Sequence, residues 1–208
     1  MFGEEFWRNA LIGGPIILFS LTVHEFFHAW TALKFGDTTA RDMGRLTLDP
    51  LKHLSLTGTL VMVLSQFTFG WAKPVPVNLM NVRDPRRADL WISAAGPLSN
   101  IGLAIAFAFL AHIAVMLSFD VGEVGRRFLS FAVVINLALA FFNAIPLFPL
   151  DGSHMLRSLV PESMGHSLDQ FSQYAPFLLL ILVFVGGVWL IIGPPTMMFY
   201  SILFPSGL

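Results

Sequence analysis

The sequence predicts an all-α polytopic membrane protein, and three observations point to that class. Hydrophobic residues make up 55% of the 208 residues, charged residues make up 12%, and the mean hydropathy is +0.72, which is far from the balance of a soluble domain. Several apolar runs reach the length of about 20 residues that a membrane-spanning helix needs. Lys and Arg gather in two segments between these runs, as is typical of cytoplasmic loops.

Charge and cysteine content limit the partners of this chain. A net charge of -1 gives no basic field for nucleic acid, so no nucleic-acid partner is expected. Because cysteine is absent, disulfides and thiolate ligands are excluded, and His, Asp and Glu are the strong metal-binding side chains that remain. The opening stretch MFGEEFWRNA lacks the basic region and cleavage site of a secretory signal, so we expect the first span to be retained.

The order of apolar and basic segments predicts each element. Two basic loops with four Lys or Arg each flank a short apolar run at 56–70, which we therefore expect to re-enter on the side it left rather than to span. Residues 1–208 should form one membrane-embedded domain. A three-helix core covers about 9–152, and one or two further membrane helices lie in about 153–208. The expected spans are 9–34, 88–118, 127–147 and 174–192, with short apolar runs at 56–70 and 194–205.

The first span contains LTVHEFFHAW, in which His24, Glu25 and His28 lie within five residues. Three unrelated polar residues would be costly, because one charged side chain at the bilayer centre costs about 2.5–3.5 kcal/mol and a neutral His still needs partners. On a helix, side chains at i and i+4 stack about 6 Å apart, so both imidazoles can bind one metal. H-E-x-x-H is a zinc-binding signature in which the Glu handles the proton of the attacking water.

Catalytic zinc usually takes three protein ligands, so a third must be found. In FFNAIPLFPLDGSHML, Pro146 and Pro149 should unwind the chain at the end of a span. Unwound backbone at membrane depth lines a cavity or is buried in protein, which makes Asp151 the strongest candidate. The alternatives are that Asp151 caps the next helix or that His154 is the ligand.

Two other histidines and two asparagines also have plainer interpretations. His53 could approach the metal from its loop, although a solvated loop residue is the default interpretation, and His112 is better explained as a structural histidine. Asn100 and Asn136 could line the same cavity or form interhelical hydrogen bonds. These alternatives stay open on the sequence alone.

Membrane topology supports one shared depth for the three candidate ligands. With the N-terminus outside, the first span brings His24 and His28 to its cytoplasmic half. If 56–70 does not cross, the following two spans leave Asp151 at the cytoplasmic end as well, whereas a full crossing would place it on the far side. We therefore expect a metal site nearer the cytoplasmic face.

These motifs resemble those of the site-2 protease family of intramembrane zinc metalloproteases. HEFFH is similar to its metal-binding helix, NAIPLFPLDG to its N-x-x-P-x-x-x-L-D-G signature, and GPLSN at 96–100 to its middle-helix motif. The resemblance is to compact members of the family that lack a PDZ domain, and it implies one zinc ion per chain. It also implies transmembrane proteins or peptides as substrates, a lipid bilayer of a prokaryotic cell membrane as the setting, and the following site residues: His24, His28 and Asp151 as zinc ligands, Glu25 as general base, and Asn143 as a donor near the oxyanion.

Two segments after the first span have the character of short strands. GRLTL alternates polar and apolar residues, and AKPVPVN presents the amides of Lys73, Val75 and Val77 along one edge. We expect a small β element near the membrane surface, with that edge pairing with protein or with unwound substrate. A stiff proline loop without a partner is the alternative.

A second class of function is a non-proteolytic membrane metal-binding protein or a metal transporter, in which buried ligands form part of an ion path. Glu25 argues against this class, because a transport site needs no general base beside its metal. The spans also lack the paired interrupted helices, in two similar halves, that many transporters have.

Overall fold

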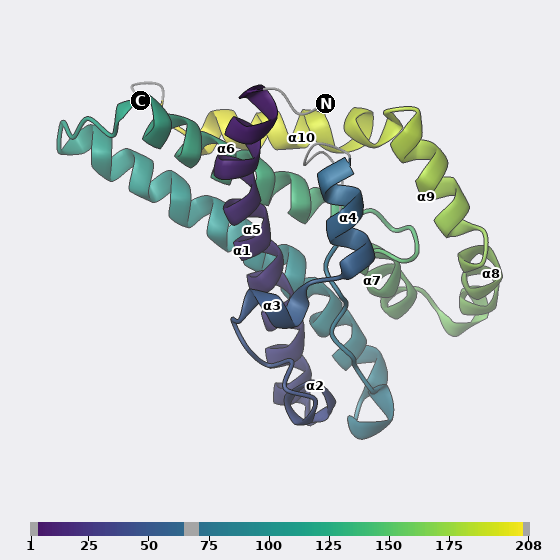
Figure 1. Ribbon diagram of the computed structural model, residues 1–208. Coiled ribbons are helices and arrows are strands. Elements are labelled where there is room, and N and C mark those ends of the chain that lie inside the picture. The colour runs from purple at the N-terminus through teal and green to yellow at the C-terminus, as the bar shows by residue number, and fades with distance from the viewer. Residues whose placement is uncertain (1–3, 65–70, 206–208) are drawn as a thin grey trace.

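The computed structural model describes residues 4–64 and 71–205. Within these ranges the regular elements are all helices, which confirms the all-α class (Figure 1). A 3-10 helix, η1 (Leu79–Asn81), lies between α4 and α5. The helices are α1 (Glu4–Phe35), α2 (Thr39–Asp42), α3 (Pro50–His53), α4 (Leu56–Leu64), α5 (Pro85–Met116), α6 (Gly122–Asn143), α7 (Asp151–Leu159), α8 (Glu162–Ser172), α9 (Ala175–Phe184) and α10 (Gly187–Leu203).

Three helices of the described ranges are long and apolar enough to cross a membrane: Gly13–Phe35 within α1, all of α5 and all of α6. They correspond to the predicted spans at 9–34, 88–118 and 127–147. α5 is central, because it packs against α1, α6 and α7. Its start is well defined: Pro85 occupies the first turn and the Asp84 carboxylate accepts a hydrogen bond from the Arg87 amide at 3.1 Å.

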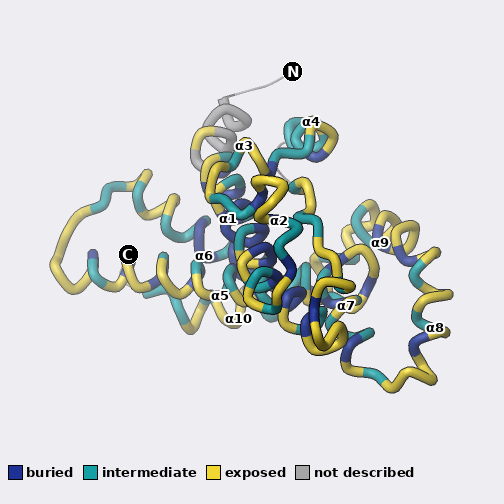
Figure 2. The backbone as a smooth tube through the Cα atoms, turned by 90° about the horizontal axis from the view of Figure 1, so that it is seen from below, coloured by how far each residue is buried: buried dark blue, intermediate teal, exposed yellow. Residues whose placement is uncertain are grey.

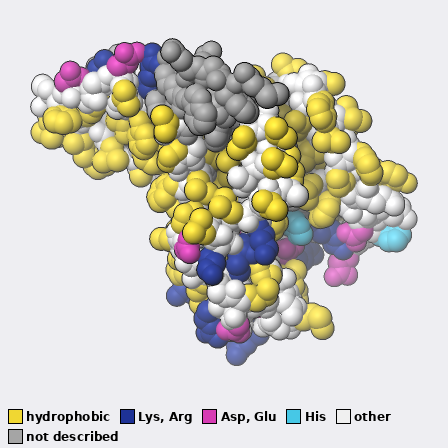
Figure 3. Space-filling model, viewed as in Figure 1, with side chains coloured by type: hydrophobic (Ala, Val, Ile, Leu, Met, Phe, Trp, Pro, Cys, Tyr) yellow, Lys and Arg dark blue, Asp and Glu magenta, His cyan; other side chains and the backbone are white. Residues whose placement is uncertain are grey.

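Small side chains allow these helices to approach closely. Ala104, Ala108, Val133 and Leu137 form a buried cluster between α5 and α6, as expected where membrane helices pack through small residues. Figure 2 shows the buried residues concentrated where α1, α5 and α6 meet. The outer faces are covered by exposed apolar side chains (Figure 3), such as Phe109 at 63% exposed, which suits contact with lipid.

The predicted span at 174–192 is wrong as a single helix. α9 ends at Phe184, Gly186 adopts a positive φ of 72°, and α10 then begins at Gly187. Glycine reaches this left-handed conformation without a steric penalty, so the chain can turn there. α10 therefore joins the end of that run to the short run expected at 194–205. α8 and α9 meet at a bend of 57°, and the pair can count as one broken span.

The run at 56–70 begins as α4, and residues 65–70 lie outside the described ranges. Leu54 and Ala72 form an antiparallel bridge, and the Lys73 amide donates to the His53 carbonyl at 2.8 Å. The two ends of the run therefore lie together. Close ends are what a re-entrant run, rather than a span, would have.

The strand expected at GRLTL does not form, and the β element is limited to the bridge between Leu54 and Ala72 in the described ranges. Side chains use backbone groups that a ladder would need. Within GRLTL the Thr47 carbonyl accepts a hydrogen bond from the His53 Nε2 at 2.9 Å, and on the following segment the Lys73 carbonyl accepts one from the Arg45 guanidinium at 2.6 Å.

Candidate metal centre

Helix α1 carries His24 and His28 one turn apart, and both side chains are buried, at 5% and 8% exposed. The Nδ1 of His28 donates to the carbonyl of Ile92 at 2.6 Å, and the Nδ1 of His24 donates to the Oδ1 of Asn100 at 2.7 Å. Because each Nδ1 is held by α5, both Nε2 atoms turn toward one point and lie 3.0 Å apart. A ligating histidine commonly has its second nitrogen fixed in this way.

Asp151 reaches the same point from the opposite side. α6 ends at Asn143, the chain with Pro146 and Pro149 is irregular, and α7 begins at Asp151, so the predicted unwinding is confirmed. The Oδ2 of Asp151 lies 3.2 Å from the Nε2 of His24, and its Oδ1 lies 3.4 Å from the Nε2 of His28.

Two glycines make this approach possible. A Cβ at Gly96 would lie 2.4 Å from the His28 Nε2 and 2.5 Å from the His24 Cε1. A Cβ at Gly152 would lie 2.3 Å from the Ala144 carbonyl oxygen. Since real Cβ atoms do not approach other atoms so closely, a larger side chain at either position would displace the ligand groups.

The three side chains form a group that could hold a metal ion, because their ligand atoms all lie within 4.8 Å of one another. The Oδ2 of Asp151 is buried, and apart from the His24 Nε2 at 3.2 Å it has no polar partner in the described ranges. Such an unsatisfied carboxylate oxygen is costly unless a cation compensates it. Two imidazoles and a carboxylate are also a donor set of catalytic zinc, with one position left open. The residues present therefore fit zinc. Within the described ranges the start of α7 has no side-chain capping hydrogen bond, so the capping role open for Asp151 is not seen.

Behind His24 lies a chain of buried amides that crosses three helices. Asn100 and Asn136 are each 0% exposed. The Nδ2 of Asn100 donates to the Oδ1 of Asn136 at 3.0 Å, and the Nδ2 of Asn136 donates to the Ala132 carbonyl at 2.8 Å. Of the two roles open for these asparagines, the structure has interhelical hydrogen bonding. The link to the His24 ring was missed, because a single sequence does not show which side chain on α5 faces it.

Glu25 faces the segment that follows the re-entrant run. Its Oε2 accepts a hydrogen bond from the Val75 amide at 2.8 Å, and the residue is 9% exposed. The edge expected to pair with protein or substrate therefore pairs with protein here, through Val75 and through Lys73.

Asp37 holds the far end of this segment. Its buried carboxylate accepts hydrogen bonds from the Asn78 amide at 2.7 Å and the Asn81 side chain at 2.8 Å. Burial raises the pKa of Asp37, but the hydrogen bonds from Asn78, Thr39 and Asn81 outweigh it and hold this pKa below its usual value. The segment is thus fixed at both ends, with its middle beside Glu25.

Asn143, the expected oxyanion donor, is the last residue of α6, and its Nδ2 donates to the Leu139 carbonyl at 3.0 Å. His154 stands outside the metal group, since its Nδ1 lies 3.4 Å from the Oδ1 of Asp89. The structure thus places Asn143 at the edge of the unwound chain and gives His154 a different partner.

His53 and His112 have structural partners. His53 is 2% exposed and its Nε2 donates to the Thr47 carbonyl at 2.9 Å, so the default interpretation as a solvated loop residue was wrong. His112 donates to the Leu203 carbonyl at 2.9 Å, in keeping with a structural role.

Fold and site together define an integral membrane protein in which two buried histidines and a partly buried aspartate could hold a metal ion. Comparison with known proteins gives its family: the profile described as "Peptidase family M50" matches residues 122–186. The chain is 39% identical over 175 residues to a Bacillus subtilis protein named "Putative zinc metalloprotease YwhC", covering 81% of this chain and 78% of that protein. This chain belongs to peptidase family M50, the site-2 protease family, and it is a zinc metalloprotease.

Two more distant relatives agree with this family. "Putative zinc metalloprotease Rip2" of Mycolicibacterium smegmatis is 32% identical over 170 residues, covering 80% of this chain and 64% of that protein. "Zinc metalloprotease MJ0392" of Methanocaldococcus jannaschii is 24% identical over 161 residues, covering 77% of this chain and 37% of that protein. The chain thus spans less than two thirds of these two relatives. No solved structure gives a significant match.

Proposed function

We propose that this zinc metalloprotease hydrolyses peptide bonds within or near the transmembrane segments of other membrane proteins. One observation carries the proposal: the two histidines of the metal group are buried and lie inside a helix that is long and apolar enough to span the membrane, the stretch Gly13–Phe35. A peptide bond must come to membrane depth to reach such a group. Soluble chains would have to enter the bilayer, whereas membrane helices are already there.

Each residue of the site has a proposed role. His24, His28 and Asp151 hold one zinc ion. When bound, zinc supplies a Lewis acid that polarises the scissile carbonyl and acidifies water. Glu25 takes the proton from the attacking water and returns it to the leaving amine. The Val75 amide donates a hydrogen bond to the Oε2 of Glu25 at 2.8 Å. This contact orients the carboxylate and leaves Oε1 to accept the proton of the water.

Asn143 is the proposed donor to the developing oxyanion. Its amide carries two N–H groups, of which one is used by the Leu139 carbonyl. The second remains for a substrate oxygen at the unwound chain between α6 and α7. Removal of one oxyanion donor typically costs about 10²- to 10³-fold in kcat, so Asn143 is expected to assist rather than to be indispensable.

We place the site in the cytoplasmic half of a prokaryotic cell membrane. The supporting observation is that basic side chains gather at the end of the molecule formed by α2 and the loop before α5, the lower end of the view in Figure 3. His24 and His28 lie in the half of α1 that leads to this end. A metal transporter is not favoured, because the family is one of peptidases.

The test is peptide cleavage by the purified protein in lipid vesicles. A panel of labelled membrane-spanning peptides and one soluble peptide are each incubated with the protein, with chelator, and with chelator followed by added zinc. We expect zinc-dependent cleavage of membrane-spanning peptides and none of the soluble peptide. Equal cleavage of the soluble peptide, or cleavage that survives complete removal of zinc, would contradict the proposal.

A further inference from the structure

A second feature of the molecule is a groove of about 820 Å³ between α1 and α5. Phe27 and Thr31 line it from α1, while Ala95, Ser99 and Gly102 line it from α5. None of the proposed zinc ligands lines it. A Cβ built at Gly102 would meet nothing within 4 Å, so the groove is open at that point. Its volume is in the range of about 300–1,000 Å³ that is typical of small-molecule sites.

One end of the groove is cationic and aromatic. Lys34 and Arg87 line this end, together with Trp30 and Trp91. Lys34 Nζ lies 5.1 Å from the centroid of the Trp30 ring, and the two tryptophans are 42% and 49% exposed. Within the part of the chain that the structure describes, neither Lys34 nor Arg87 forms an ion pair, and no acidic side chain lines the groove. Two positive charges therefore face this end without a counter-ion.

The length of the groove distinguishes between possible occupants. On α5 it extends from Arg87 to Leu103, which at 1.5 Å per residue is about 24 Å. The hydrocarbon core of a bilayer is about 30 Å thick, so one leaflet contributes about 15 Å. The groove is long enough for the headgroup and the chains of a lipid from one leaflet. It is too short for a helix that spans the membrane.

We propose that this groove binds an anionic phospholipid from the leaflet that adjoins the basic loops. The phosphate would lie between Lys34 and Arg87, because both can donate to its oxygens. Trp30 and Trp91 would lie at headgroup level, where tryptophan is enriched in membrane proteins. The acyl chains would follow the apolar wall past Phe27 and Gly102.

The test is lipid retention by the whole purified protein in mixed micelles of phosphatidylglycerol and phosphatidylcholine, followed by native mass spectrometry. We expect one phosphatidylglycerol per chain to bind more tightly than phosphatidylcholine. The double variant Lys34→Gln/Arg87→Gln should bind it about 10- to 30-fold more weakly, the result of losing two charges near the headgroup. Equal retention by wild type and this variant, or no preference for phosphatidylglycerol, would overturn the proposal.

A matched control removes the same charge from the same basic end of the molecule. Lys52 and Arg83 are exposed and do not line the groove, so Lys52→Gln/Arg83→Gln should retain the lipid as wild type does. If this control loses the lipid equally, attraction is only the general field of the basic loops and the site is disproved.

Two further arms separate a lipid from its headgroup alone. Gly102→Phe fills the groove where there is free space, so it should expel the lipid while both charges and the fold remain. Inorganic phosphate at millimolar concentration should not displace phosphatidylglycerol, because it lacks the chains. Lipid retention by Gly102→Phe, or displacement by phosphate, would show a surface phosphate site and overturn the proposal.

Discussion

In each imidazole of the metal centre, both ring nitrogens have a defined partner. Nδ1 of His24 and of His28 is held by groups on α5, and Nε2 of each faces Asp151. Since the buried Asp151 Oδ2 has no other partner in the described ranges, the group is incomplete without a cation. The residue scale therefore gives the sharpest tests of zinc binding.

Asp151→Ala should lose most of the zinc from the purified protein, because two imidazoles alone are a poor site. His154→Ala is the matched control, and it should keep one zinc per chain because His154 faces Asp89 instead. Metal analysis of both proteins is the measurement. Full occupancy in Asp151→Ala together with loss in His154→Ala would reverse the assignment of the third ligand.

Asn100→Leu should lower zinc affinity by about 10- to 100-fold, the usual effect of removing a partner that orients a ligating histidine. Asn100→Asp should restore part of it, since a carboxylate also accepts the Nδ1 proton of His24 but cannot donate to the Asn136 Oδ1. Zinc dissociation constants from competition with a chromogenic chelator measure both, independently of activity. Wild-type affinity in Asn100→Leu would mean that this contact does not position the ring.

The site residues were predictable to the extent that they carry motifs. His24, Glu25 and His28 stand out because three polar residues in a membrane helix need a joint reason, and Asp151 stands out because prolines unwind the chain before it. Asn100 could not be singled out, since its role depends on how α5 rotates against α1. The same holds for the Val75 amide, which is a backbone group and leaves no side-chain signal.

The segment between the re-entrant run and α5 is the element with the most distinctive connections. The Val75 amide binds Glu25, while Lys73 and Asn78 are held by Arg45, His53 and Asp37. An extended, proline-containing chain is thus placed directly beside the proposed general base. This arrangement makes the backbone of the segment part of the site.

Val75→Pro removes the amide hydrogen that Glu25 accepts. A hydrogen bond to a charged group is worth about 1.5–3 kcal/mol, so kcat should fall by about 10- to 100-fold while zinc content stays unchanged. Val77→Pro is the control, because the Val77 amide makes no hydrogen bond in the described part of the chain. Equal kcat values in the two variants would show that the Val75 contact has no role in turnover.

Helices of the core were predictable and the C-terminal ones were not, for physical reasons. α1, α5 and α6 are long apolar runs whose ends are marked by charges, Pro85 or the prolines after Asn143. At 174–192 the hydropathy is equally high, but Gly186 allows a turn within it. GRLTL has the alternation of a strand, yet its Thr47 carbonyl accepts a hydrogen bond from the His53 side chain and its Arg45 side chain binds the Lys73 carbonyl, and the alternation reveals neither contact.

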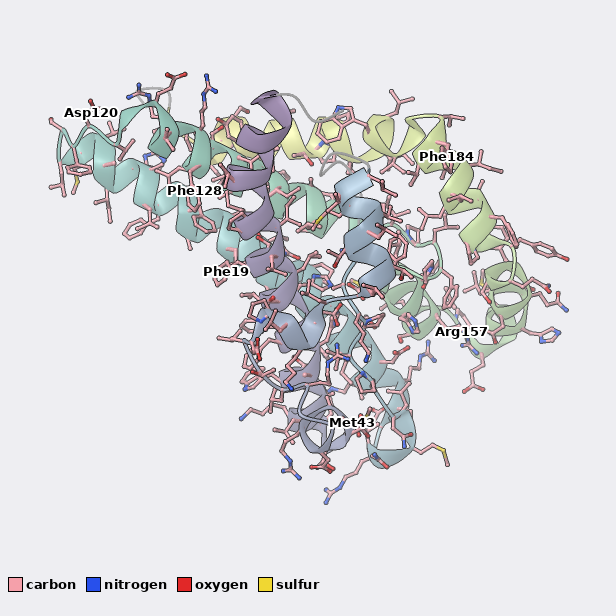
Figure 4. All side chains as sticks on the ribbon, in the orientation of Figure 1. Phe19, Met43, Asp120, Phe128, Arg157 and Phe184 are labelled. Carbon is pink, nitrogen blue, oxygen red and sulfur yellow. The ribbon has the colours of Figure 1, made fainter. Side chains whose placement is uncertain are left out.

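At the scale of the whole molecule, the account requires 56–70 to return to the side it left. Figure 4 shows Met43 and Asp120 at opposite ends of the molecule, as two loops on opposite sides of a membrane would be. Met43 and Met80 are 64% and 93% exposed and Phe119 is 66% exposed. These residues suit labelling, because among the residues that the structure describes neither Met has a polar side-chain contact that a cysteine would break.

Single cysteines at Met43 and Met80 should react with an impermeant maleimide from the same side, and a cysteine at Phe119 from the other. The native chain has no cysteine to interfere. Labelling intact cells and then inverted vesicles measures the side. Opposite sides for Met43 and Met80 would separate Asp151 from the histidines in the membrane and contradict the zinc site.

The most direct test of the whole mechanism is Glu25→Gln, measured by cleavage of a membrane-spanning peptide and by zinc content of the same sample. Gln is nearly isosteric and leaves His24 and His28 in place, but it cannot take a proton from water or return one to the amine. The rate of cleavage should fall by about 10²- to 10⁴-fold or more, while one zinc per chain is retained. The control is Glu162→Gln, which changes an exposed carboxylate on α8 and should cleave the peptide at the wild-type rate. A Glu25→Gln protein that holds zinc and cuts at the wild-type rate would contradict the protease mechanism.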